Sequence, residues 1–105
     1  MKIIHNKLVR DNIPEIIGNS GKTAHYYVLD NDADFDKALK AKLIEEVNEL
    51  FNAETEEECV EELADIVTIL TILFAKYEGV RAVAKAKLSQ KGGFKRRYFL
   101  ESVEE

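Results

Sequence analysis

Acidic side chains follow a helical spacing in the middle of this chain. Glu49 stands four residues after Glu45 and three after Glu46, and Glu62 and Asp65 stand three residues apart further on. Residues three and four apart share one face of a helix, so two acidic arcs are predicted on consecutive helices. Converging carboxylates repel each other and are costly to desolvate, and a hard divalent cation relieves both costs. Oxygen ligands of this kind favour Mg²⁺, Mn²⁺ or Ca²⁺ over zinc.

Some of these carboxylates border apolar faces, which distinguishes them from an ordinary solvated acidic run. At about 100° per residue, Glu46 falls about 60° from Leu43, on the edge of the apolar stripe of its helix. Glu62 and Asp65 stack over the apolar rows that contain Ile69. The acidic residues between the two arcs suit the solvated surface and first turn of a helix instead: Glu54, Glu56, Glu57 and Glu58. The candidates for a functional role are therefore Glu46, Glu49, Glu62 and Asp65.

Two long helices must carry these side chains. The first is capped by Asp32 or Asp34 and is predicted over Phe35 to Asn52, because its apolar residues recur on one face. Thr55, with Glu58 three residues later, forms a capping-box pattern that opens a second helix, predicted from Thr55 to Tyr77. The short connector makes the two helices antiparallel neighbours. The two acidic arcs can then meet.

Shorter elements are expected on either side of this hairpin. Pro14 to Asn19 is predicted as a short helix, and Val80 to about Gln90 as another. Thr23 to Leu29 is rich in aromatic and β-branched residues, which is typical of a strand. We expect it to pair with Phe94 to Val103, because one strand alone does not persist. The predicted fold class is all-α with a small two-stranded β element.

Length and composition favour one small domain. The chain has 105 residues, of which 46 % are hydrophobic and 33 % charged, and no repeat or linker interrupts it. We therefore treat residues 1–105 as a single domain. The stretch Ile66 to Phe74 is apolar nearly all round, which is more than a two-helix hairpin can cover. A second copy is expected to cover it, in a homodimer or a higher homo-oligomer.

Charge and cysteine content restrict the partners and the compartment. A formal net charge of -5 argues against general binding to a nucleic acid backbone. The single cysteine, Cys59, forms no internal disulfide, which fits a reducing cytosol, and a cytoplasmic location is expected. The longest apolar run, Ile66 to Ala75, is about half of the roughly 20 residues that a membrane span needs. No membrane segment is predicted.

The acidic residues and both ends of the chain together resemble a known superfamily. Glu45-Glu46-x-x-Glu49 followed by Glu62-x-x-Asp65 is similar to the signature of the all-α nucleoside triphosphate pyrophosphohydrolases. That superfamily includes MazG, the α-helical dUTPases and dCTPases, and phosphoribosyl-ATP pyrophosphohydrolase. The opening HNKLVRDNIPEII and the closing KGGFKRRYFL look like its small MazG-like, house-cleaning branch. The resemblance thus covers nearly the whole chain.

The resemblance implies a function and a role for each acidic residue. It implies a MazG-like four-helix bundle that hydrolyses a nucleoside triphosphate, or a related phosphoanhydride, to a monophosphate and pyrophosphate with Mg²⁺ or Mn²⁺. It implies Glu46, Glu49, Glu62 and Asp65 as metal ligands, and Glu45 as the residue that orients or deprotonates the attacking water. The basic residues expected to clamp the substrate phosphates are Lys7, Arg10, Lys22, Lys42, Lys91, Lys95 and Arg96.

Two functions from other classes remain open. A helical interaction module would keep the bundle without any chemistry, and neutralising its acidic arc would leave the protein as stable or more stable. A nucleic-acid-binding protein would use the basic, aromatic segment KGGFKRRYF, and its binding would weaken with salt. No motif in the sequence specifies a base or a sugar.

Overall fold

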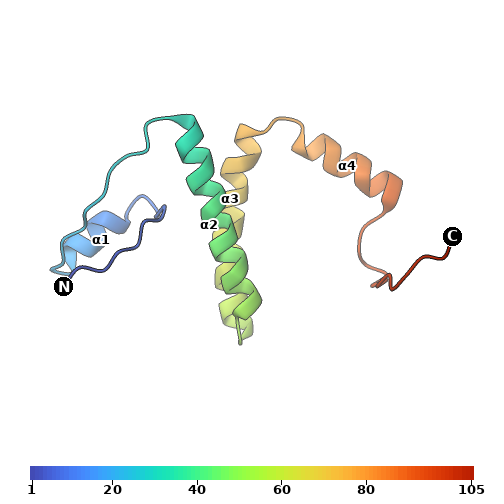
Figure 1. The fold of residues 1–105 in the computed structure, drawn as a ribbon, viewed down its shortest axis with the longest axis horizontal. Helices are drawn as coiled ribbons and strands as arrows, with labels where there is room; N and C mark the ends of the chain where they lie inside the picture. Colours follow the sequence, from blue (N-terminus) through green and yellow to red (C-terminus); the bar gives the residue numbers. More distant parts are fainter. The chain divides into compact units, whose positions relative to one another are not determined.

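The computed structural model describes the whole chain, residues 1–105, as four helices without a β-strand (Figure 1). The helices are α1 (Ile13–Asn19), α2 (Asp32–Asn52), α3 (Glu56–Lys76) and α4 (Val80–Lys91). The all-α class is therefore confirmed. None of the four helices combines the length and the apolar composition of a membrane span. The chain divides into two compact units, Met1–Ile72 and Leu73–Glu105, which are described separately below.

Helices α2 and α3 form the hairpin that dominates the first unit, and their ends follow from local capping. The side chain of Asn31 accepts a hydrogen bond of 2.8 Å from the backbone N–H of Asp34, so the α2 cap is Asn31 rather than Asp32 or Asp34. At the start of α3, the backbone N–H of Glu58 donates to the Thr55 hydroxyl at 3.1 Å. Thr55 therefore caps α3 as predicted, but the Glu58 carboxylate accepts from the backbone N–H of Glu54 at 2.9 Å rather than from that of Thr55, so the capping box is only half formed.

The hairpin buries little apolar surface by itself. Its buried apolar side chains are Leu39 of α2 and Ile69 of α3, which are 1 % and 6 % exposed. One charged side chain, Glu46, is buried with them at 4 % exposure. Several large apolar residues of both helices stay exposed: Ile44, Val47, Phe51, Val60, Leu63 and Val67. The two helices therefore lie side by side with the acidic residue Glu46 in the seam between them.

The predicted β element is wrong. Thr23 to Leu29 and Phe94 to Val103 have no regular secondary structure, and no strand hydrogen bonds join them. Tyr27 and Phe99 are 84 % and 90 % exposed, so the aromatic residues that suggested strands bury little surface. A strand depends on a partner for its hydrogen bonds, and an aromatic, β-branched composition cannot supply one.

The N-terminal segment and α1 complete the first unit. α1 begins one residue earlier than predicted, with Asn12 as its N-cap and Pro14 in its first turn. The segment before it carries Lys7 and Arg10, both of which contact the hairpin through their side chains. This segment therefore positions two cations against the acidic side of α2 and α3.

The second unit contains the last turn of α3, α4 and the C-terminal segment. Gly79 caps the start of α4 with a φ of 85°, a left-handed conformation that glycine adopts without strain. α4 extends to Lys91, one residue beyond the predicted end, and Gly92 follows with a φ of 80°. Every residue of this unit after Val80 is exposed.

Candidate metal centre

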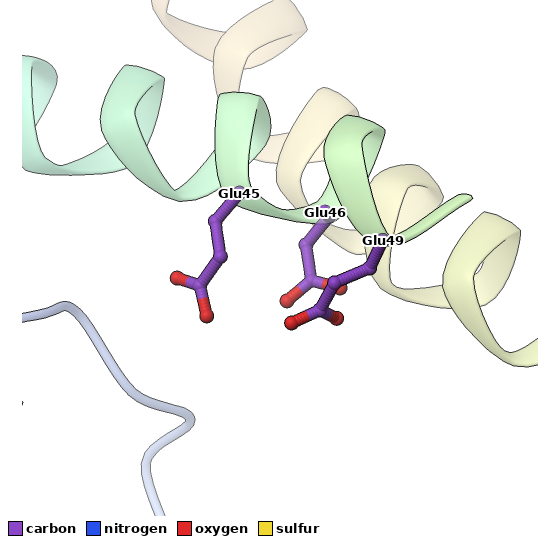
Figure 2. A group of neighbouring side chains, drawn as sticks. All are labelled: Glu45, Glu46 and Glu49. Atoms are coloured by element: carbon purple, nitrogen blue, oxygen red, sulfur yellow. The ribbon is translucent and has the colours of Figure 1, made fainter. Parts of the chain in front are cut away.

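The five acidic residues of the two arcs converge in the hairpin, and we call them the carboxylate cluster: Glu45, Glu46, Glu49, Glu62 and Asp65. They form two overlapping groups, one on α2 alone and one that joins Glu46 to Glu62 and Asp65 of α3. Within each group the carboxylate oxygens lie within 4.8 Å of one another. Figure 2 shows the α2 group, with all three carboxyl groups on one side of the helix. Glu46 belongs to both groups.

Two oxygens of the cluster are buried without a hydrogen-bond partner. They are Oε2 of Glu46 and Oε2 of Glu62, one from each helix. A buried polar atom without a partner costs roughly 1–3 kcal/mol, and more when it is charged. Proteins therefore rarely keep such atoms unless a proton, water or ion satisfies them. Both are carboxylate oxygens, the type of ligand that a hard cation prefers.

The neighbouring carboxylates raise the pKa of Glu62. Hydrogen bonding with Glu46, and then with Glu49, favours the protonated form of Glu62 and raises its pKa to about 8. Burial and the negative charges of the same two residues act in the same direction. In the absence of a cation, Glu62 therefore holds a proton at neutral pH.

Lys42 lies within the cluster and pairs with two of its members. Its Nζ is 3.3 Å from Oε2 of Glu45 and 3.3 Å from Oε1 of Glu46. Burial disfavours the charge of Lys42, but the contacts with Glu46 and Glu45 outweigh burial and raise its pKa. Lys42 was predicted as a substrate-binding residue, and in the structure it holds two carboxylates of α2 in place.

The N-terminal segment adds a second cation at Glu45. Nζ of Lys7 is 3.1 Å from Oε1 of Glu45, although the two residues are 38 positions apart in the sequence. Burial opposes the ionisation of Glu45, yet the hydrogen bonds from Lys7 and Lys42 lower its pKa. Glu45 therefore stays ionised at neutral pH, and its proton affinity is lower than that of an ordinary glutamate.

Arg10 makes the corresponding contact on α3. Its Nη2 lies 2.6 Å from Oδ1 of Asp65 and donates a further hydrogen bond of 3.3 Å to the Thr68 hydroxyl. The Thr68 hydroxyl in turn donates to the carbonyl of Ala64 at 3.1 Å. Thr68 was not predicted as a site residue. Its position three residues after Asp65, on the same helix face, is the signal that could have indicated it.

The charges of the site nearly balance. The cluster has five carboxylates, and the three cations paired with it are Lys7, Arg10 and Lys42. When every group is ionised, two negative charges remain, which is the charge that one divalent cation compensates. With Glu62 protonated, a single negative charge remains. The proton on Glu62 and a bound cation are thus alternative ways to relieve the same repulsion.

The other predicted substrate-binding residues lie outside this cluster. Lys22 is exposed, and its only described hydrogen bond is from its backbone N–H to the carbonyl of Ile17 at 3.4 Å. Lys91, Lys95 and Arg96 are exposed residues of the second unit. The structure therefore brings Lys7, Arg10 and Lys42 to the carboxylates, and a role for the remaining four stays a prediction.

Known proteins provide no further guide to this site. The chain matches no family model, no curated protein and no solved structure.

Proposed function

We propose that this protein is a metal-dependent nucleoside triphosphate pyrophosphohydrolase, releasing pyrophosphate and a nucleoside monophosphate. The observation that carries the proposal is the position of Glu46, which is buried, belongs to both carboxylate groups and has an oxygen without a hydrogen-bond partner, as Glu62 does. An arrangement of this kind is expensive for a purely structural role, because like charges repel at short range. A cation-binding role accounts for it.

The residues that would hold Mg²⁺ or Mn²⁺ are Glu46, Glu49, Glu62 and Asp65. When bound, the cation neutralises charge on a phosphoanhydride, which is most of what such a hydrolysis requires of a site. Lys7 and Arg10 pair with the edge of the carboxylate cluster, on a segment without regular secondary structure before α1. Their guanidinium and ammonium groups are suited to the phosphates of a substrate.

Glu45 is proposed to orient the attacking water. Its carboxylate belongs to the α2 group, beside Glu46 and Glu49, and it is paired with Lys7 and Lys42. The lowered pKa of Glu45 favours accepting a hydrogen bond from water over removing a proton from it. We therefore propose that Glu45 orients the attacking water and does not deprotonate it, although the sequence left both roles open.

The proposal includes a homo-oligomer. With only Leu39 and Ile69 as buried apolar side chains, the hairpin has a small core for its length. Its exposed apolar side chains on α2 and α3 would be covered by the same surface of a second copy, completing a four-helix bundle. Analytical ultracentrifugation tests this, and a protein that remains monomeric at micromolar concentration would exclude it.

The proposed activity is tested by pyrophosphate release from a panel of standard and modified nucleotides, with and without Mg²⁺. We expect turnover only with the cation, and a loss of at least about tenfold in cation affinity in Glu62→Gln and Asp65→Asn. Glu61→Gln is the matched control, because Glu61 is exposed and outside the cluster. The proposal fails if no nucleotide is hydrolysed and both variants bind the cation as the wild type does.

One observation favours a second function. The unit Leu73–Glu105 has eight Lys and Arg residues but only four Asp and Glu residues, although the whole chain is acidic. Segregated positive charge of this kind can bind a nucleic acid backbone. Retention on single- or double-stranded nucleic acid that decreases with salt would support this function. Retention unchanged by neutralising Lys95 and Arg96 would exclude their part in it.

A further inference from the structure

A cavity of about 230 Å³ lies beside the carboxylate cluster, between the N-terminal segment and α2. Three of its lining residues belong to the candidate metal centre: Lys7, Lys42 and Glu45. The remaining lining residues are one amide and three small or apolar side chains: Asn6, Leu8, Ala38 and Ala41. The cavity is therefore charged where it meets the metal centre and mostly apolar elsewhere.

The lining residues of α2 follow one stripe of the helix. Ala38, Ala41 or Lys42, and Glu45 are three or four residues apart, so they face the same side. At 1.5 Å per residue, the alanines begin about 10 Å before Glu45 along the helix axis. The order along α2 is thus apolar surface, then a lysine, then the carboxylates. A nucleotide has the matching order of base, phosphates and phosphate-bound cation.

The volume of the cavity limits what can enter it. Pockets that enclose a drug-sized ligand begin at about 300 Å³, so this cavity takes part of a nucleotide and not the whole molecule. Its apolar residues suit the faces of an aromatic ring, whereas Lys7 and Lys42 at the charged end suit phosphates. The ring would enter the apolar end, and the phosphates would remain at the carboxylate cluster.

Asn6 is the one uncharged polar residue among those that line the cavity. It has a φ of 46°, a left-handed conformation that is uncommon outside glycine and in which asparagine is enriched. Residues in sparsely populated backbone conformations are concentrated at ligand-binding sites. The amide of asparagine both donates and accepts hydrogen bonds, and a nucleobase edge presents neighbouring donors and acceptors in the same way.

We infer that this cavity binds the nucleobase of the substrate, with Asn6 as a specificity-determining residue and Ala38 and Ala41 as the surface on which the ring packs. The inference rests on the proposed function in that the substrate is a nucleoside triphosphate. It goes beyond that function by locating the base.

The test is calorimetric binding, with Mg²⁺ present, of four α,β-methylene nucleoside triphosphates and of inorganic triphosphate, which has no base. We expect at least one nucleotide to bind about tenfold more tightly than inorganic triphosphate. Ala41→Leu fills the cavity and should abolish this preference while the affinity for inorganic triphosphate changes less than about twofold. Ala86→Leu, at an exposed position of α4, is the control and should keep the preference.

Two variants of Asn6 separate its amide from its backbone. Asn6→Gly keeps the left-handed conformation and should lower the affinity for every nucleotide but not for inorganic triphosphate. Asn6→Asp replaces the donor and should change the order of the four bases.

Several results would overturn the inference. They are equal binding of inorganic triphosphate and all nucleotides, no binding of any nucleotide, or an Ala41→Leu variant that keeps the wild-type preference. A different result would exclude the proposed hydrolysis and leave the base-binding cavity supported. A base preference that depends on Ala41 and Asn6, without Mg²⁺-dependent hydrolysis of the natural nucleotides, would support the cavity and exclude the activity.

Discussion

Binding of a divalent cation is expected to release a proton from Glu62. The carboxylates Glu46 and Glu49 raise the pKa of Glu62 to about 8, so at pH 7 this group is about 90 % protonated in the cation-free protein. A carboxyl group binds a hard cation only when it is deprotonated. Cation binding at pH 7 should therefore release about 0.9 protons, and at pH 9 only about 0.1, because the group is then already ionised.

The same equilibrium predicts how affinity depends on pH. Below pH 8 the proton competes with the cation, so the apparent affinity should rise by about tenfold per pH unit and then level off above pH 8. Calorimetric titration with Mn²⁺ or Mg²⁺ in two buffers of different ionisation enthalpy measures the released protons directly. Repeating it from pH 6 to 9 measures the change in affinity.

Two variants identify the source of the proton. Glu62→Gln cannot release it, so proton release should fall to near zero and the affinity should lose its pH dependence. Glu61→Gln should behave as the wild type, because Glu61 is an exposed neighbour outside the cluster. The reasoning is refuted if the wild type releases no proton at pH 7, or if Glu62→Gln releases as many protons as the wild type does.

The other predictions concern stability and the paired cations. The folded cation-free protein keeps the Glu62 proton that the unfolded chain loses above pH 4.5, so its unfolding free energy should fall as pH rises from about 4.5 to 8. Urea melts with saturating Mg²⁺ should not show that fall, because the bound cation replaces the proton. A fall that Mg²⁺ does not change would contradict this prediction. Arg10→Ala removes the positive charge paired with Asp65, so the Mg²⁺ affinity measured by calorimetry should rise about two- to fivefold while turnover decreases. Lys37→Ala, at an exposed position, is the control. Unchanged affinity in Arg10→Ala would argue against competition between Arg10 and the cation for Asp65. Leu39→Ala should lower the unfolding free energy by about 2–5 kcal/mol in the same urea melts. Leu63→Ala should lower it less, because the Leu63 side chain is half-exposed. Equal losses in the two variants would place the core elsewhere.

Much of the hairpin could be predicted from the sequence because its signals are local. The cap at Thr55 acts within one helical turn, and its hydroxyl accepts from the backbone N–H of Glu58 as predicted. α2 begins at Asp32, three residues before the predicted Phe35, because Asn31, Asp32 and Asp34 are all suitable caps and the structure uses Asn31. The strands were missed for another reason, since pairing is a property of two segments and not of one.

The acidic site was also predicted only in part from the sequence. The spacing of Glu45, Glu46 and Glu49 was sufficient to place their carboxylates on one side of α2, because 3.6 residues make one turn of any α-helix. The sequence also identified Glu62 and Asp65 as their counterparts. It could not predict that Oε2 of Glu46 and of Glu62 would be buried without partners, because burial depends on how two helices pack.

The sequence by itself therefore determined the two acidic arcs and the helices that carry them. Only the tertiary structure decided the electrostatics of the site. Lys7 and Arg10 are 38 and 55 residues away in sequence from Glu45 and Asp65, the carboxylates they pair with. No local rule predicts those pairs, and the pKa of Glu62 depends on Glu46 and Glu49 from the other helix. Coulomb interactions act through space, so a charge and its partner are set by the path of the chain.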